Sequence, residues 1–205
     1  MEYRNLQVNE KIEQVRQYRP GRDERQYMAI YLKALRRGDQ QVTEEYESFG
    51  NSPRQIIMNR RAYDRGQLFG FTGKHFSPYG WLQNSTFTER EEIRFIHKQG
   101  WAANNYLTIG QGENGKWTYG VSSSTGAWGH CYGLSIWGKV FDSRKECLKT
   151  ALQEIFDGHR EAAERLKNDT CGNFNAQYSK EVTRQVKNLL DELTGRKAVQ
   201  LELFK

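Results

Sequence analysis

The chain has 205 residues, 37% of them hydrophobic and 27% charged, with a formal net charge of +6. This composition is typical of a soluble globular protein with one large domain or two small ones. No apolar run approaches the length of a membrane span and no hydrophobic signal segment follows the first residues, so we expect a cytoplasmic protein without membrane contact. Three cysteines, an odd number without a Cys-x-x-Cys pair, argue against a disulfide scaffold and against a zinc finger.

The N-terminal part of the chain predicts helices. A first helix ends before the Pro-Gly pair at residues 20–21, and a second runs from about residue 23 to residue 37, with Gly38 as its stop. The sequence Ser-Pro-Arg-Gln at 52–55 combines a serine cap, a proline at the first helical position and a glutamine three residues after the cap. It therefore predicts a further helix, which ends near residue 66.

Basic and aromatic residues alternate between residues 54 and 81. Residues 1–75 contain 14 Lys or Arg and 10 Asp or Glu, so this third of the chain holds most of the excess positive charge. A basic surface of this kind favours nucleic acid, with phosphates on the cations and bases stacked on aromatic rings. The residues expected to bind nucleic acid are Arg54, Arg60, Arg61, Arg65, Lys74 and Trp81, with Phe71, Phe76 and Tyr79 as further stacking candidates. An arginine-rich solvated helix, followed by an aromatic loop docked on the core, explains the same sequence equally well.

Residues 67–87 have no helical or strand periodicity and are rich in glycine and aromatic residues. A loop of this length in a compact domain is usually functional or poorly ordered. The sequence Thr-Glu-Arg-Glu at 88–91 is a capping box, and it predicts a helix from Thr88 to Lys98 that Gly100 closes.

An antiparallel sheet is expected next. Short aromatic and β-branched runs separated by Gly-rich turns occupy residues 105–109, 117–122 and 132–137, and residues 140–141 are expected to add a last short strand. The sequence Gly-Gln-Gly-Glu-Asn-Gly at 110–115 has the Gly-x-Gly-x-x-Gly pattern of dinucleotide sites, but a strand follows it where such a site needs a helix. We therefore interpret it as a hairpin turn and expect no cofactor.

Two long helices complete the predicted fold. Ser143 caps the first, whose apolar stripe extends to Leu166, and a second stripe from Val182 to Leu193 predicts a final helix that Gly195 ends. The sequence thus predicts an α+β protein with N-terminal helices, a small antiparallel sheet of three to four strands and two long C-terminal helices.

We expect a helical portion at 1–100, a sheet-plus-helices portion at 101–195 and a tail at 196–205. The first two portions form either separate units or one continuous domain. The strand-to-helix junction at 138–148 resembles the sheet-plus-helix DNA-binding modules of phage integrases, although no residue match carries a role over.

No set of residues predicts a catalytic or metal site. His130 and Cys131 are neighbours, so on a strand they point to opposite faces and cannot form the hydrogen-bonded pair that a cysteine nucleophile needs. Cys131 is expected to be a small buried residue. Asp142 and Glu146, next to a lysine, have the groups of a metal-dependent nuclease, but a helix cap explains them more simply. The acidic residues of 154–164 are expected on a solvated helix face.

A short motif follows the last predicted helix. Residues 200–204 are Gln-Leu-Glu-Leu-Phe, which resembles the peptide by which bacterial polymerases and repair proteins bind the DNA sliding clamp. The resemblance implies the clamp as partner, with Gln200, Leu201, Leu203 and Phe204 as the partner-binding residues. Glu202 stands where Ser or Asp is more usual in the motif. The alternative is a terminal edge strand in which the odd-numbered apolar residues point inward.

The physical chemistry of the motif suits weak, reversible binding. Three apolar side chains in a pocket give roughly 1.5–3 kcal/mol each, and ordering a handful of flexible residues costs on the order of 1–2 kcal/mol each. The sequence therefore favours a non-enzymatic, DNA-associated accessory protein of a bacterium, phage or mobile element. The alternatives are a nucleic-acid-processing enzyme recruited by the same motif and a globular domain unrelated to DNA.

Overall fold

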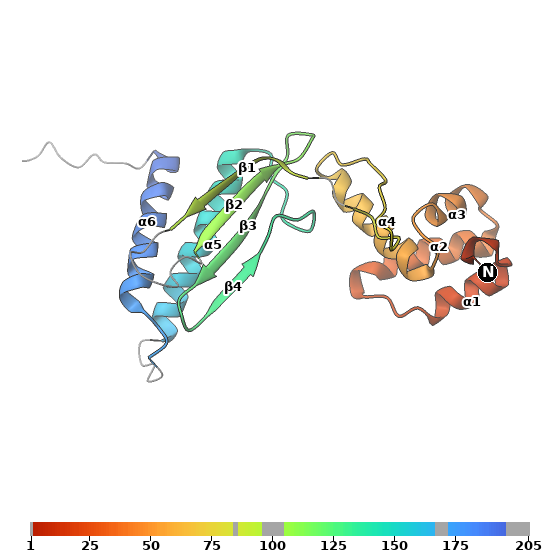
Figure 1. Cartoon of the computed structure of the whole chain (residues 1–205), viewed down its shortest axis with the longest axis horizontal. Coiled ribbons are helices and arrows are strands. Elements are labelled where there is room, and N and C mark those ends of the chain that lie inside the picture. The colour runs from red at the N-terminus through yellow and green to blue at the C-terminus, as the bar shows by residue number, and fades with distance from the viewer. Residues whose placement is uncertain (1, 84–85, 96–104, 167–171, 196–205) are drawn as a thin grey trace, which may run out of the picture. The chain divides into compact units, whose positions relative to one another are not determined.

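The computed structural model describes residues 2–83, 86–95, 105–166 and 172–195. The chain divides into two compact units, one from Met1 to Thr86 and one that begins at Phe87. We call them the helical unit and the sheet unit (Figure 1). The sequence placed this division at residue 100; the structure has it before a strand that begins at Thr88.

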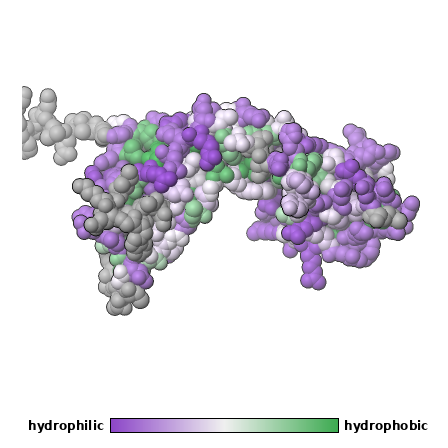
Figure 2. Space-filling view, in the orientation of Figure 1, coloured by the Kyte–Doolittle hydropathy of each residue, from purple (hydrophilic) through white to green (hydrophobic). Residues whose placement is uncertain are grey.

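Helices build the helical unit. The elements are two 3-10 turns, η1 (Tyr3–Asn5) and η2 (Arg22–Glu24), and four α-helices, α1 (Val8–Gln17), α2 (Arg25–Arg37), α3 (Gln40–Glu47) and α4 (Pro53–Gln67). The predicted helix limits are confirmed by their caps. Gly38 ends α2 in the left-handed conformation with φ of 66°, and the Ser52 hydroxyl accepts the N–H of Gln55 at the start of α4. The face of this unit that Figure 2 shows is mostly hydrophilic.

The core of the helical unit contains an ion pair among aromatic rings. Lys11 Nζ of α1 lies 2.8 Å from Glu47 Oε1 of α3, and the Tyr31 hydroxyl of α2 donates to the same oxygen at 2.9 Å. Both charged residues are buried. A buried charge is tolerated when a partner and hydrogen bonds satisfy it, so this cluster joins three helices.

The aromatic loop after α4 is docked on that helix. The Asn59 side chain donates to the carbonyl of Gly80 at 2.8 Å and accepts the N–H of Leu82 at 3.0 Å. Gln55 donates to the carbonyl of Tyr79 at 2.9 Å. Two side chains of α4 therefore hold the backbone of the loop, and the loop adopts a fixed shape without being a helix or a strand.

The sheet unit is a four-stranded antiparallel sheet with two long helices. Its strands follow in the order β1 (Thr88–Arg94), β2 (Tyr106–Gln111), β3 (Trp117–Ser124) and β4 (Gly129–Tyr132), and its helices are α5 (Arg144–Arg165) and α6 (Ala176–Thr194). In Figure 1 both helices cover one face of the sheet, with the edge strand β4 on the side away from α6. The whole chain is thus α+β, as predicted.

The core of the sheet unit lies between the sheet and the two helices. Alternate residues of β2 and β3 point toward α5, and α6 completes the layer. Its buried members include Leu107, Ile109, Tyr119, Val121, Leu148, Leu152, Ile155, Val182 and Val186. Gly195 ends α6 with φ of 70°, as predicted.

The predicted helix from Thr88 is wrong. Residues Thr88–Arg94 form β1, an edge strand that pairs Glu91 with Ile109 and Ile93 with Leu107 of β2. The end of the predicted helix, at 96–100, lies outside the described residues. The capping-box pattern is a local signal, and pairing with a distant strand overrides it. The hairpin turn expected at 110–115 is confirmed, since β2 and β3 pair on either side of it.

The last predicted strands also differ from the structure. The strand expected at 132–137 is β4, which ends at Tyr132, and residues 140–141 contribute only a single bridge from Phe141 to Trp117. The chain after β4 instead crosses over β3 at Gly120. A Cβ atom at Gly120 would lie 2.6 Å from the carbonyl carbon of Gly133, so only glycine admits this crossing.

Candidate functional site

Two of the predicted nucleic-acid contacts on α4 are paired within the helical unit. Arg60 forms ion pairs with Glu45 and with Asp64, and Arg61 lies 3.0 Å from a carboxylate oxygen of Asp23. A guanidinium that already faces carboxylates offers less charge to a phosphate. Arg65 lies half-buried in the last turn of the same helix.

The other predicted contacts lie at the aromatic loop. Arg54 is exposed, and its guanidinium carbon lies 5.7 Å from the centre of the Trp81 ring. Lys74 is exposed as well, with Nζ 4.2 Å from the Phe49 ring and 3.2 Å from the Ser48 hydroxyl. Both cations therefore rest on aromatic rings and keep their outer sides open to solvent.

The stacking candidates separate by exposure. Phe71 is buried and cannot stack on a base, whereas Tyr79 is 81% exposed at the tip of the loop and Phe76 is 37% exposed. A pocket of about 460 Å³ opens beneath these two rings, with Arg4 among its lining residues. Arg4 was missed by the sequence analysis because it is far from the loop in sequence. The surface of Arg54, Lys74, Phe76, Tyr79 and Trp81 is hereafter the loop surface.

A second candidate site lies between strands β3 and β4 and helix α5. The carboxylate of Glu154, on α5, accepts hydrogen bonds from Tyr132 at 2.6 Å and from Tyr119 at 2.7 Å. Nε2 of His130 lies 3.0 Å from the same carboxylate. Strands β3 and β4 thus direct three polar aromatic side chains onto one carboxylate.

Hydrogen bonds from its neighbours favour the ionised form of the Glu154 carboxylate. Burial alone would raise the pKa of Glu154, but the hydrogen bonds from Tyr132, Tyr119 and His130 outweigh it and lower this pKa. Burial, helped by the carboxylate, raises the pKa of Tyr119 to about 12 and also raises the pKa of Tyr132. At neutral pH the site therefore holds a carboxylate and two neutral phenols.

The histidine of this group is poorly placed for catalysis. A carboxylate accepts only, so the proton is assigned to Nε2 of His130 and the lone pair to Nδ1. Nδ1 is buried and has no hydrogen-bond partner in the part of the chain that the structure describes. A general base must reach its substrate, and this lone pair faces inward. The adjacent Cys131 is exposed, so the expectation of a buried residue was wrong: β4 is an edge strand.

A third polar group is fully enclosed. His159 of α5 lies 2.9 Å from the Ser179 hydroxyl of α6 and 3.0 Å from the Asn105 side chain. The residue types match a nucleophile (Ser179), a base (His159) and an orienting group (Asn105). All three are buried, at 2%, 0% and 1% exposed respectively. No substrate reaches them, so we interpret the group as a structural link between α5, α6 and the sheet.

Neither a metal cluster nor a membrane span is present among the described residues. No three His, Cys, Asp or Glu side chains in the described ranges converge to hold a metal ion. None of the described helices is long and apolar enough to cross a membrane. The motif residues Gln200, Leu201, Leu203 and Phe204 lie outside the described residues.

Comparison with known proteins gives no match. No protein-family model, no curated protein and no solved structure matches this chain.

Proposed function

We propose that this chain is a cytoplasmic, DNA-associated accessory protein that binds the bacterial sliding clamp through residues 200–204 and touches nucleic acid through the loop surface. The observation that carries the proposal is the sequence Gln-Leu-Glu-Leu-Phe at 200–204. Helix α6 ends at Thr194, capped by Gly195, so five residues separate the capped helix end from the motif. That spacing supports a binding peptide joined to a folded body.

The loop surface supports the nucleic-acid half of the proposal. Arg54 and Lys74 are exposed cations, and Tyr79 presents an open ring for stacking. Stacking of a base on an aromatic ring is worth about 1–3 kcal/mol and needs no particular sequence. Two weak contacts in one chain raise each other's effective concentration, so neither contact needs to be tight.

A pull-down tests the proposed partner. The intact protein is compared with a version that lacks residues 200–205, using a bacterial lysate and detection of the clamp. We expect the clamp only with the intact protein, and nearly equal melting temperatures for the two. A large fall in melting temperature on truncation would place the apolar residues in the core and would favour the edge-strand alternative.

A second candidate is an enzyme that acts on nucleic acid and is recruited by the same motif. The cluster of His130, Tyr119, Tyr132 and Glu154 beside a pocket favours it, whereas the buried Nδ1 lone pair opposes it. Labelled single- and double-stranded DNA and RNA, incubated with the protein and with the His130→Gln variant, separate the two candidates. Processing that the variant loses would establish the enzyme.

A further inference from the structure

The turn between β3 and β4 holds Trp128 against α5. Its backbone N–H donates to the Thr125 hydroxyl at 3.2 Å, and its carbonyl accepts the N–H of Thr125 at 2.7 Å. Trp128 is nevertheless 47% exposed. Thr125 is fully buried, so the turn presents a large aromatic ring to solvent from a fixed base.

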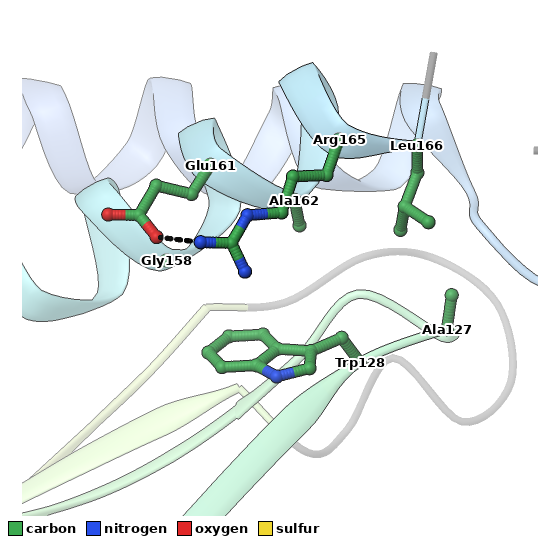
Figure 3. Close-up of a pocket in the computed structure, with 7 residues that line it drawn as sticks. All are labelled: Ala127, Trp128, Gly158, Glu161, Ala162, Arg165 and Leu166. Carbon is green, nitrogen blue, oxygen red and sulfur yellow. Dashed lines mark ion pairs between the residues drawn. The ribbon is translucent and has the colours of Figure 1, made fainter. Parts of the chain in front are cut away.

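Gly158 explains how the ring can lie so close to the helix. Glycine in a helix interior is disfavoured relative to alanine. A Cβ atom at Gly158 would lie 3.3 Å from Cζ3 of Trp128, closer than ordinary contact. In Figure 3 the indole faces α5 at this position. The glycine thus makes room on α5 for the ring.

The ring forms one wall of an acidic pocket. This pocket, of about 400 Å³, is also lined by Tyr119 and His130 and by three carboxylates of α5, Glu154, Asp157 and Glu161. Lys139 is its one cationic Lys or Arg side chain among the described lining residues. Aromatic faces and carboxylates both attract a cation, so the lining selects for positive charge.

The carboxylates nearest to solvent are paired with other side chains of α5, and Asp157 also accepts a hydrogen bond from Gln153 at 3.0 Å. Asp157 lies 3.5 Å from Arg160, and Glu161 lies 3.5 Å from Arg165, in pairs that are largely exposed. Exposed ion pairs of this kind contribute little to stability. Figure 3, which draws the neighbouring pocket lined by Ala127, Ala162 and Leu166, shows the ion pair of Glu161 and Arg165 on α5 opposite the Trp128 ring. A ligand cation can therefore replace these arginines at little cost.

An apolar pocket continues from the acidic one. It has a volume of about 210 Å³ and shares Trp128, Gly158 and Glu161 with the acidic pocket. Its further lining residues are Ala127, Ala162 and Leu166, with Arg165 as the partner of Glu161. A ligand that fills both pockets needs a cationic group joined to an apolar one.

We propose that these joined pockets bind a basic peptide segment of a partner protein. The guanidinium or ammonium group of an arginine or lysine lies on the Trp128 ring between Asp157 and Glu161, and a neighbouring apolar side chain fills the second pocket. This site consists of other residues than the 200–204 motif and the loop surface, and it assigns a second protein partner to the sheet unit.

Isothermal titration of the full chain tests the proposal with two peptides, acetyl-Gly-Arg-Leu-Gly-amide and the same peptide with citrulline in place of arginine. Citrulline keeps the shape of arginine and removes its charge. We expect saturable binding of the arginine peptide and at least about tenfold weaker binding of the citrulline peptide. Equal binding of the two, or no binding of the arginine peptide up to about 5 mM, would overturn the proposal.

Variants place the binding in the pocket. We expect about tenfold weaker binding of the arginine peptide by two variants, Asp157→Asn with Glu161→Gln and, separately, Trp128→Leu. Matched controls are Glu164→Gln on the same helix and Trp137→Leu, at a residue that is also 47% exposed, and both should bind as the unchanged protein does. If the controls weaken binding as much as the pocket variants, the site is elsewhere. If spermidine binds as tightly as the arginine peptide, the proposal that the ligand is a peptide is contradicted.

Discussion

At the scale of single residues, the enclosed group around His159 makes stability depend on pH. Burial lowers the pKa of His159 from 6.5 to about 4, so the folded protein keeps this ring neutral. The unfolded chain binds a proton there at a higher pH than the folded chain does. The free energy of unfolding therefore contains a contribution that is complete above about pH 6.5 and is lost as the pH falls toward about 4.

We expect acidification from pH 7 to pH 5 to remove about 2 kcal/mol of stability through His159 alone. Urea unfolding at the two pH values measures this loss in the unchanged protein and in His159→Gln. The variant should be less stable at pH 7 and should lose less on acidification. His75→Gln, at an exposed histidine, is the matched control and should follow the unchanged protein. Equal losses for His159→Gln and the unchanged protein would contradict a buried neutral ring.

At the scale of elements, local signals predicted caps better than they predicted strands. The caps at Gly38, Ser52 and Gly195 depend on a few adjacent residues, and all three are confirmed. Strand β1 was mistaken for a helix because its pairing partner lies elsewhere in the chain. The sequence predicted a strand at 132–137, whereas β4 is Gly129–Tyr132. The crossing that ends β4 depends on contact between Gly120 and Gly133, which no local pattern shows.

Some residues of the candidate sites could be predicted from the sequence. Arg54, Lys74 and Trp81 came from a local alternation of basic and aromatic residues. The group around Glu154 could not be predicted, because its members come from β3, β4 and α5 and meet only in the fold. The acidic stripe of α5 was interpreted as a solvated face, since helical periodicity alone does not show that Trp128 faces it.

The crossing after β4 can be tested by adding one methyl group. Gly120→Ala should lower the free energy of unfolding by about 2 kcal/mol or more, because the new Cβ meets backbone that cannot rotate away. Gly133→Ala is the control, since no atom lies within 4 Å of a Cβ there. It should change stability by less than about 1 kcal/mol. Chemical denaturation measures both, and equal effects would show that the crossing is not where the structure has it.

At the scale of the whole molecule, the two units carry separate parts of the proposed function. The helical unit contributes the loop surface, and the sheet unit contains α6, the helix that precedes the 200–204 motif in the sequence. The net charge of +6 is modest, so nucleic-acid affinity is expected to be weak when the protein acts alone. Attachment to a clamp that encircles DNA would supply the missing local concentration.

Salt dependence tests the loop surface. Fluorescence anisotropy with labelled single-stranded DNA should show binding at about 50 mM salt that weakens steeply as salt rises. Arg54→Ala with Lys74→Ala should flatten the slope of log K against log salt by between one and two. Arg60→Ala with Arg61→Ala should flatten it less, because those side chains already pair with carboxylates. Absence of binding at low salt would remove the nucleic-acid half of the proposal.

The most direct test of the central claim is titration of a bacterial clamp with the peptide from Gly195 to Lys205 and then with the intact protein. Leu203→Ala with Phe204→Ala removes most of the apolar burial, on the order of 3–5 kcal/mol. Since each 1.4 kcal/mol is about tenfold, this change should abolish a micromolar interaction. Glu202→Ala, at a position that tolerates variation in the motif, is the matched control and should bind as before. We expect saturable binding of both the peptide and the protein, and binding of neither by the cognate clamp would contradict the proposed function.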